Sequence, residues 1–205
     1  MKYIVDLNTI KEYNTHHCTV QPTRAALLVM DMQNVFLNEP AIITENQINN
    51  INSIIAVAEK VGVKIIYVRH NDDAELSQTI VDWWGGDKIE KGSDGWQIIS
   101  EFDTTGKTIV DKNQYSAFFK THLDDILKKE NIKDMIITGV MTNCCCETTA
   151  RDAFMHGYRV FFMNDATATS SEELHLATLK NLSFGFAYVQ NTQELIEDIM
   201  GLIKT

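Results

Sequence analysis

The stretch MIITGVMTNCCCETTARDAF, residues 135–154, decides the fold of this chain. Its first residues, Met135 to Ile137, form a short apolar run that is typical of a strand buried on both faces. From Cys146 onward, residues 147, 150, 151 and 154 recur at helical spacing. The strand must therefore turn into a helix at residues 142–145. Unpaired N–H groups and the helix dipole at such a turn lower the pKa of a thiol, which favours a nucleophile.

Three consecutive cysteines occupy this turn, and they cannot all serve one role. Neighbouring side chains at a helix start point about 100° apart. We therefore expect at most one of Cys144, Cys145 and Cys146 to face a cleft above the sheet. Free cysteine is also among the most buried residue types, so the alternative is that all three are small apolar packing residues.

Residues 139–152 resemble the nucleophile signature of the isochorismatase-like cysteine hydrolases. That signature reads Gly, Val or Ile, a small residue, Thr, Asn or Asp, any residue, Cys, then Val or Cys, Glu, Ser or Thr, and Thr. Aligned on Gly139, its catalytic cysteine is the middle one, Cys145. Cys144 and Cys146 fall at positions that are usually apolar, so the resemblance implies that both are packing residues.

A second candidate lies after the apolar run Ala25 to Met30, which predicts a central parallel strand. Asp31 follows this strand, on the side where open α/β sheets bind ligands, although position alone allows a solvated turn residue equally well. Residues 31–36, DMQNVF, resemble the family motif Asp-x-Gln-x-x-Phe. The aspartate of that motif is the general base, and the resemblance gives this role to Asp31.

A third candidate follows the short predicted strand at residues 108–110. A lysine directly after a strand is usually solvated. However, residues 112–118, KNQYSAF, resemble the second family motif, whose lysine lies in the active site. The resemblance thus implies a catalytic set of Asp31, Lys112 and Cys145. By the same analogy, the backbone N–H groups of Met141 and Cys145 form the oxyanion hole, next to a cis Val140–Met141 peptide bond. The predicted substrate-binding residues are Gln33, Phe36, Trp84 and Tyr115.

The remaining chain alternates between strand and helix patterns. Further strands are predicted at residues 63–68, 158–163 and 186–189, and helices at 45–60, 116–129, 172–182 and 192–203. Such alternation indicates an α/β fold with a mostly parallel sheet. With the resemblance, we expect a three-layer α/β/α, Rossmann-like sheet of six strands. Residues 71–106 form the longest irregular region, and they could be a lid, a binding loop or an interface. The tryptophans of this region are more simply explained as anchors to the core or as part of a subunit interface than as substrate contacts.

Composition bounds the rest. The chain has 205 residues, 44% of them hydrophobic, and a formal net charge of −10. We expect one domain over residues 1–205, with residues 1–22 as a surface arm or edge hairpin, and no nucleic-acid partner. Without an apolar signal segment or a membrane span, the expected location is the cytoplasm. The four cysteines do not form a disulfide framework.

No metal or other cofactor is expected. Nicotinamidases, a metal-using branch of the family, carry Asp-x-His near the second strand, whereas this chain has Arg69-His70 there, so His70 is expected in a loop or cleft wall. The run His16-His17-Cys18 lacks a second pair of ligands. The segments at 91–93 and 115–119 look closer to ureidoacrylate and N-carbamoylsarcosine amidohydrolases than to nicotinamidases.

The resemblance therefore implies a cysteine hydrolase that cleaves a C–N bond of a small amide, ureide or carbamoyl compound through a thioester. A homo-oligomer, dimer or tetramer, is expected with it. The alternatives are an isochorismatase-type vinyl-ether hydrolase, a non-catalytic scaffold that keeps the fold, and a redox role for the cysteine run. The last is disfavoured because adjacent cysteines lack Cys-x-x-Cys spacing.

Overall fold

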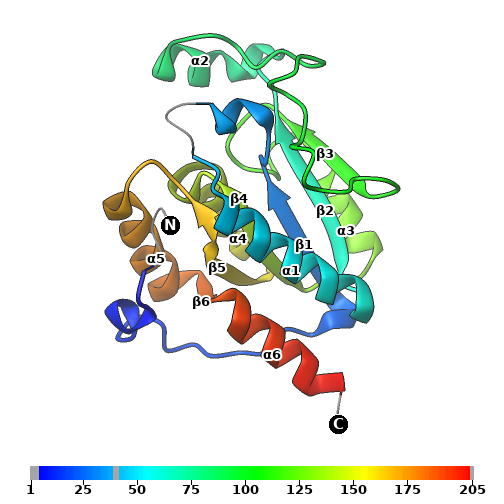
Figure 1. Cartoon of the computed structure of the whole chain (residues 1–205), viewed down its shortest axis with the longest axis vertical. Helices are drawn as coiled ribbons and strands as arrows, with labels where there is room; N and C mark the ends of the chain where they lie inside the picture. Colours follow the sequence, from blue (N-terminus) through cyan, green and yellow to red (C-terminus); the bar gives the residue numbers. More distant parts are fainter. Residues whose placement is uncertain (1–4, 39–41, 204–205) are drawn as a thin grey trace.

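The computed structural model describes residues 5–38 and 42–203, and their centre is one six-stranded parallel sheet (Figure 1). The strand order is β3-β2-β1-β4-β5-β6, and every pair is parallel. All residues of the two central strands are buried, which explains their unbroken apolar runs. The strands are β1 (Ala25–Met30), β2 (Lys64–His70), β3 (Thr108–Lys112), β4 (Asp134–Val140), β5 (Arg159–Ala168) and β6 (Ala187–Gln190).

Helices cover both faces of this sheet, so the predicted α/β/α layering is confirmed (Figure 1). One core cluster joins the sheet to α1 (Glu45–Val61) and α6 (Thr192–Ile203). The other joins it to α3 (Leu123–Lys129), α4 (Glu147–Met155) and α5 (Glu172–Gly185). In α1 the buried Ile51, Ile54 and Ala58 recur at helical spacing, so one apolar stripe faces the sheet.

The strand order also places the ligand crevice. From β1 the chain proceeds outward through β2 to β3, and then returns to the other side of β1 for β4, β5 and β6. The order therefore reverses between β1 and β4, and the crevice of an open α/β sheet lies beyond the carboxyl ends of the strands at such a reversal. Asp31 and the cysteine run follow those two strands.

The helix predicted over residues 116–129 begins only at Leu123. In the preceding segment, side chains take up the backbone N–H groups: Ala117 N–H donates to Thr149 Oγ1 and Phe118 N–H donates to Ser116 Oγ. Lys120 adopts a positive φ of 53°, which an α-helix does not accommodate. These local hydrogen bonds compete with the helical ladder and delay its start.

Residues 71–106 are less irregular than predicted. They contain a 3-10 turn at Glu75–Ser77 and the short helix α2 (Gln78–Trp84), which Gly85 ends with a positive φ of 65°. Figure 1 shows α2 beyond the carboxyl ends of the strands. The paired tryptophans thus lie at the end of a helix above the crevice.

The N-terminal arm is not a simple surface segment. Among its described residues, 5–22, it forms a 3-10 turn at Leu7–Ile10 and buries Val5, Ile10 and Val20, and it makes no hairpin. Asn14 donates to Val189 O and accepts from Val189 N–H. The hairpin alternative is therefore wrong for residues 5–22, which form a surface arm anchored by three buried side chains, while residues 1–4 lie outside the described residues. In the part of the chain that the structure describes, no helix is long and apolar enough to cross a membrane.

Candidate active site

Asp31 lies at the carboxyl end of β1 and is fully buried. Its backbone has a positive φ of 49°, and its N–H donates to Val68 O at 2.8 Å. The neighbouring strand fits tightly beside it, because a Cβ on Gly139 would lie 2.0 Å from the carbonyl oxygen of Met30. Only glycine permits this approach at a φ of +107°, so the end of β4 is pressed against the backbone that carries Asp31.

Lys112 is the last residue of β3 and reaches past β2 to this point. Its Nζ lies 2.9 Å from Asp31 Oδ2 and 3.2 Å from Cys145 Sγ, and it donates to Gln114 O at 3.1 Å. Burial by itself lowers the pKa of Lys112, but the Asp31 carboxylate and the Cys145 sulfur in contact with its ammonium outweigh it and the net pKa is raised. Lys112 is therefore a buried cation held between a carboxylate and a thiol.

The third predicted catalytic residue, Cys145, lies in the turn after β4. The Val140–Met141 peptide bond is cis, as the resemblance implied, and residues Thr142–Cys146 form a π-helical turn that leads into α4. Contrary to the sequence-based expectation, the pKa of Cys145 is raised. Burial is the main cause and the Asp31 carboxylate adds to it, whereas Lys112 lowers it. Burial and the neighbouring carboxylate therefore both oppose the charged form of Cys145, and Lys112 favours it.

The expectation that only one cysteine faces the cleft is wrong. Cys144 and Cys145 both line the cavity, whereas Cys146 is fully buried in the core, as predicted. Both side chains belong to the π-helical turn Thr142–Cys146 that leads into α4. Cys144 is thus a wall residue of the site and not a packing residue.

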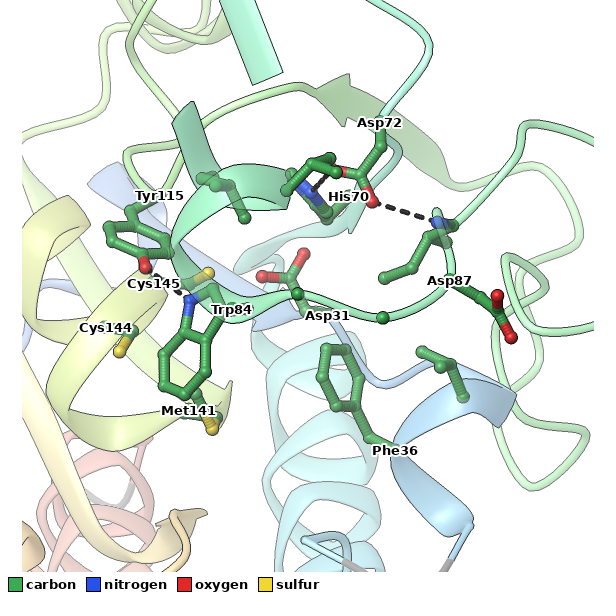
Figure 2. Close-up of a pocket in the computed structure, with 16 residues that line it drawn as sticks. Asp31, Phe36, His70, Asp72, Trp84, Asp87, Tyr115, Met141, Cys144 and Cys145 are labelled. Carbon is green, nitrogen blue, oxygen red and sulfur yellow. Dashed lines mark hydrogen bonds and ion pairs between the residues drawn. The ribbon is translucent and has the colours of Figure 1, made fainter. Parts of the chain in front are cut away.

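A cavity of about 300 Å³ lies above Asp31 and Cys145 (Figure 2). The predicted residues Phe36, Trp84 and Tyr115 line it together with Met141, and Trp84 Nε1 donates to the Tyr115 hydroxyl at 2.7 Å. Gln33 does not line it. The Gln33 amide donates to the carbonyls of His70 and Trp96 and accepts from His70 N–H, so it ties neighbouring segments together below the cavity.

Two polar residues of the wall were not predicted as substrate contacts. His70 and Asp72 line the cavity, and His70 Nε2 lies 2.8 Å from Asp72 Oδ1. For His70 the expected place in a cleft wall is confirmed. The described residues contain no group of three His, Cys, Asp or Glu side chains that could hold a metal ion. The residues present therefore do not fit a metal of the nicotinamidase kind.

The parallel sheet and the crevice at its reversal, where a thiol, a lysine and a carboxylate meet, define the class of the protein as an α/β hydrolase. The isochorismatase domain model matches residues 25–194, and the chain belongs to the isochorismatase family of hydrolases. It is similar to a cysteine hydrolase from Pseudomonas syringae pv. phaseolicola, with a TM-score of 0.80 and 28% identity over 90% of this chain and 96% of that one. An isochorismatase-like hydrolase from Alkaliphilus metalliredigens has a TM-score of 0.73 and 30% identity, covering 85% of this chain and 98% of that one.

Two sequence relatives correct the expectation that the chain is closer to ureidoacrylate hydrolases than to nicotinamidases. Nicotinamidase 3 from Arabidopsis thaliana is 42% identical, covering 95% of this chain and 98% of its own length. Ureidoacrylate amidohydrolase RutB from Acinetobacter baylyi is 26% identical, covering 85% and 83%. The closer likeness to ureidoacrylate hydrolases that the segments at 91–93 and 115–119 indicated is therefore wrong. Two short segments carried that interpretation, whereas identity over the whole chain favours the nicotinamidase.

Proposed function

We propose that this enzyme hydrolyses the C–N bond of a small uncharged amide through a thioester on Cys145. The observation that carries the proposal is the position of Lys112 Nζ, 2.9 Å from Asp31 Oδ2 and 3.2 Å from Cys145 Sγ. Moving the proton from the thiol to Asp31 replaces one ion pair by another around the same ammonium. The buried site therefore activates its nucleophile with no change of net charge, which limits the desolvation cost.

The reaction follows from these positions. Asp31 takes the proton of the Cys145 thiol as the sulfur attacks the amide carbonyl carbon and forms the S–C bond. Asp31 Oδ2 is paired with Lys112, whereas Oδ1 has no hydrogen-bond partner among the described residues, so Oδ1 is available to accept that proton. The protonated Asp31 then gives the proton to the departing nitrogen as the C–N bond breaks. Water hydrolyses the thioester, with Asp31 again as the base.

The negative oxygen of the tetrahedral intermediate needs donors in this mechanism. We assign this role to the backbone N–H groups of Met141 and Cys145. In support, both residues line the cavity and belong to the turn that carries the nucleophile. Fixed backbone donors at this point stabilise charge that develops only during the reaction.

The charge of the cavity favours a neutral substrate. Asp72 and Asp87 contribute carboxylates to its wall, and no lysine or arginine is among the lining residues that the structure describes. The rest of the wall is largely apolar, with Phe36, Met141 and Trp84. A carboxylate-bearing substrate such as ureidoacrylate would meet like charges there, whereas an aromatic amide such as nicotinamide would not. We therefore propose nicotinamide-like amides, in line with the relative of 42% identity.

The same argument weighs against vinyl-ether hydrolysis, because chorismate-derived substrates are anionic acids. A non-catalytic scaffold would have no use for a buried ammonium beside a thiol. We also propose a cytoplasmic homo-oligomer, dimer or tetramer, in keeping with four free cysteines and the family resemblance. Light scattering during size-exclusion chromatography measures that state directly.

The test of the function is ammonia release from nicotinamide, compared with ureidoacrylate at equal concentration. Cys145→Ala is expected to abolish release, and Cys18→Ala, a half-buried cysteine of the arm, serves as the matched control with full activity. A thioester adduct on the peptide that contains Cys145 is expected by mass spectrometry after rapid acid quench. Ammonia release that survives in Cys145→Ala would end the proposal, and faster turnover of ureidoacrylate would overturn the assigned substrate class.

A further inference from the structure

Two buried polar atoms on the cavity wall have no hydrogen-bond or ion-pair partner among the described residues. They are Asp31 Oδ1, whose sister oxygen Oδ2 is paired with Lys112, and the Nδ1 atom of His70. The His70 side chain is only 8% exposed, so bulk water does not satisfy it. Buried polar atoms are nearly always paired, because leaving one without a partner destabilises the folded protein. Atoms of this kind that line a cavity indicate a ligand with complementary groups.

The partners of His70 fix the chemical character of its free nitrogen. Its Nε2 lies 2.8 Å from Asp72 Oδ1, and Asp72 Oδ2 accepts from Ile89 N–H at 2.9 Å. Burial raises the pKa of Asp72, but the hydrogen bonds from His70 and Ile89 outweigh it and the net pKa is lowered. Asp72 is therefore a carboxylate, which holds the ring proton on Nε2. In the neutral ring, Nδ1 then presents a lone pair to the cavity.

We propose that His70 Nδ1 and the Asp31 carboxylate together accept the two N–H groups of a primary amide. His70 is then a further substrate-binding residue, and it selects substrates that end in –CONH2. The inference rests on the proposed amide hydrolysis and specifies which amides are used. Asp31 follows β1, His70 is the last residue of the neighbouring strand β2, and both line the same cavity (Figure 2).

The chemistry of the leaving group agrees with this assignment. An –NH2 group carries two donors, and the bound nitrogen is the one whose bond to carbon breaks. When Asp31 delivers the proton that it took from Cys145, this nitrogen leaves as ammonia. An ester with the same acyl group has no N–H donor, so it loses the contact to His70 but keeps the contacts of its ring.

The experiment compares nicotinamide with methyl nicotinate, which share the ring and the acyl carbon. His70→Leu is expected to lower kcat/KM for the amide about tenfold and to leave the ester within about twofold. Asp72→Asn, which keeps the shape but removes the charge that holds the Nε2 proton, is expected to show the same selective loss. His122, with a side chain that is 93% exposed, provides the matched control His122→Leu, which should leave kcat/KM unchanged for both substrates.

Thermal unfolding of each variant separates a folding defect from a binding effect. If His70→Leu does not fold, Asp72→Asn alone decides the matter. An equal fall for amide and ester, or no fall for the amide, would overturn the role of His70. The proposed function fails by a different result, namely nicotinamide hydrolysis that does not depend on Cys145.

Discussion

The floor of the cavity, where Asp31 and Cys145 lie over the buried Lys112, differs sharply from its roof, made by residues 80–89. Asp31 is 0% and Lys112 1% exposed, whereas Trp84 in the roof is 56% exposed. The floor is held by three parallel strands and by buried ionic contacts, while the roof is the end of a short helix and the loop after it. We infer that the floor sets the chemistry and the roof sets the fit of the substrate.

The most severe way to break the floor is Gly139→Ala. Its Cβ would lie 2.0 Å from Met30 O, a backbone atom at the centre of the sheet that cannot move aside as a flexible side chain could. We expect a loss of more than about 4 kcal/mol in the free energy of unfolding, or no folded protein. Gly157→Ala is the matched control, because Gly157 has a similar φ of +87° but open space around it, so only about 1 kcal/mol should be lost. Equal losses in urea unfolding would show that the close approach is unimportant.

Lys112→Met removes the cation of the floor and leaves the Asp31 carboxylate buried without its ion pair. We expect about 3–5 kcal/mol of destabilisation in urea unfolding, together with loss of ammonia release. Lys128→Met removes a lysine that is 67% exposed and paired with Asp124, and it should cost less than about 1 kcal/mol. A Lys112→Met protein as stable as wild type would contradict the assigned ion pair.

Support for the nucleophile turn comes from behind the floor and depends on pH. Thr142 Oγ1 lies 2.9 Å from His175 Nδ1, and His175 Nε2 lies 3.2 Å from Asn164 Oδ1. Burial lowers the pKa of His175 from 6.5 to about 4. The unfolded chain therefore binds more protons between these two values, and the folded state loses stability as pH falls through that window.

At pH 5 this histidine alone should cost about 2 kcal/mol of unfolding free energy relative to pH 7.5. The measurement is urea unfolding at both pH values for the wild type and for His175→Gln, which should lack this part of the change. His122→Gln, at an exposed histidine, should keep the wild-type difference. An identical pH difference in wild type and His175→Gln would rule out this contribution.

The smallest effect is expected in the roof. Trp84→Phe removes the Nε1–H that donates to the Tyr115 hydroxyl but keeps an aromatic wall. We expect KM for nicotinamide to rise about three- to tenfold with kcat nearly unchanged, because one hydrogen bond of about 1 kcal/mol is lost away from the reacting atoms. Trp83→Phe, at a neighbouring side chain that is 80% exposed and outside the cavity wall, should have no effect. A fall in kcat for Trp84→Phe would contradict the inference that the roof affects only the fit of the substrate.

The contrast also explains what could be predicted from the sequence. The apolar run that ends at Asp31 and the strand-to-helix turn at Cys145 are local patterns, and parallel strands bring their ends to one edge. Local motifs therefore located the floor. The strand alternation likewise predicted the layered sheet, because the central strands are buried on both faces and the helices that cover the sheet are buried on one.

The remaining features depend on tertiary partners that no local pattern encodes. His70 became a wall residue with a free nitrogen only through Asp72 and the backbone of Ile89. Gln33 matched a motif position, yet its amide is fully used by backbone groups. The lowered thiol pKa expected at a helix start was reversed by burial and by the Asp31 charge. A signal for His70 was available in the sequence, since it follows a strand as Asp31 does.

The contact of Asn14 with Val189 has a consequence for self-association. β6 is an outer strand, and an outer strand with free N–H and C=O groups is a template for adding a strand from another molecule. The Asn14 side-chain amide hydrogen-bonds both the C=O and the N–H of Val189, as a neighbouring strand would. The backbone of Val189 is therefore not available to pair with a strand of another molecule. We expect copies of the chain that associate to do so through other surfaces.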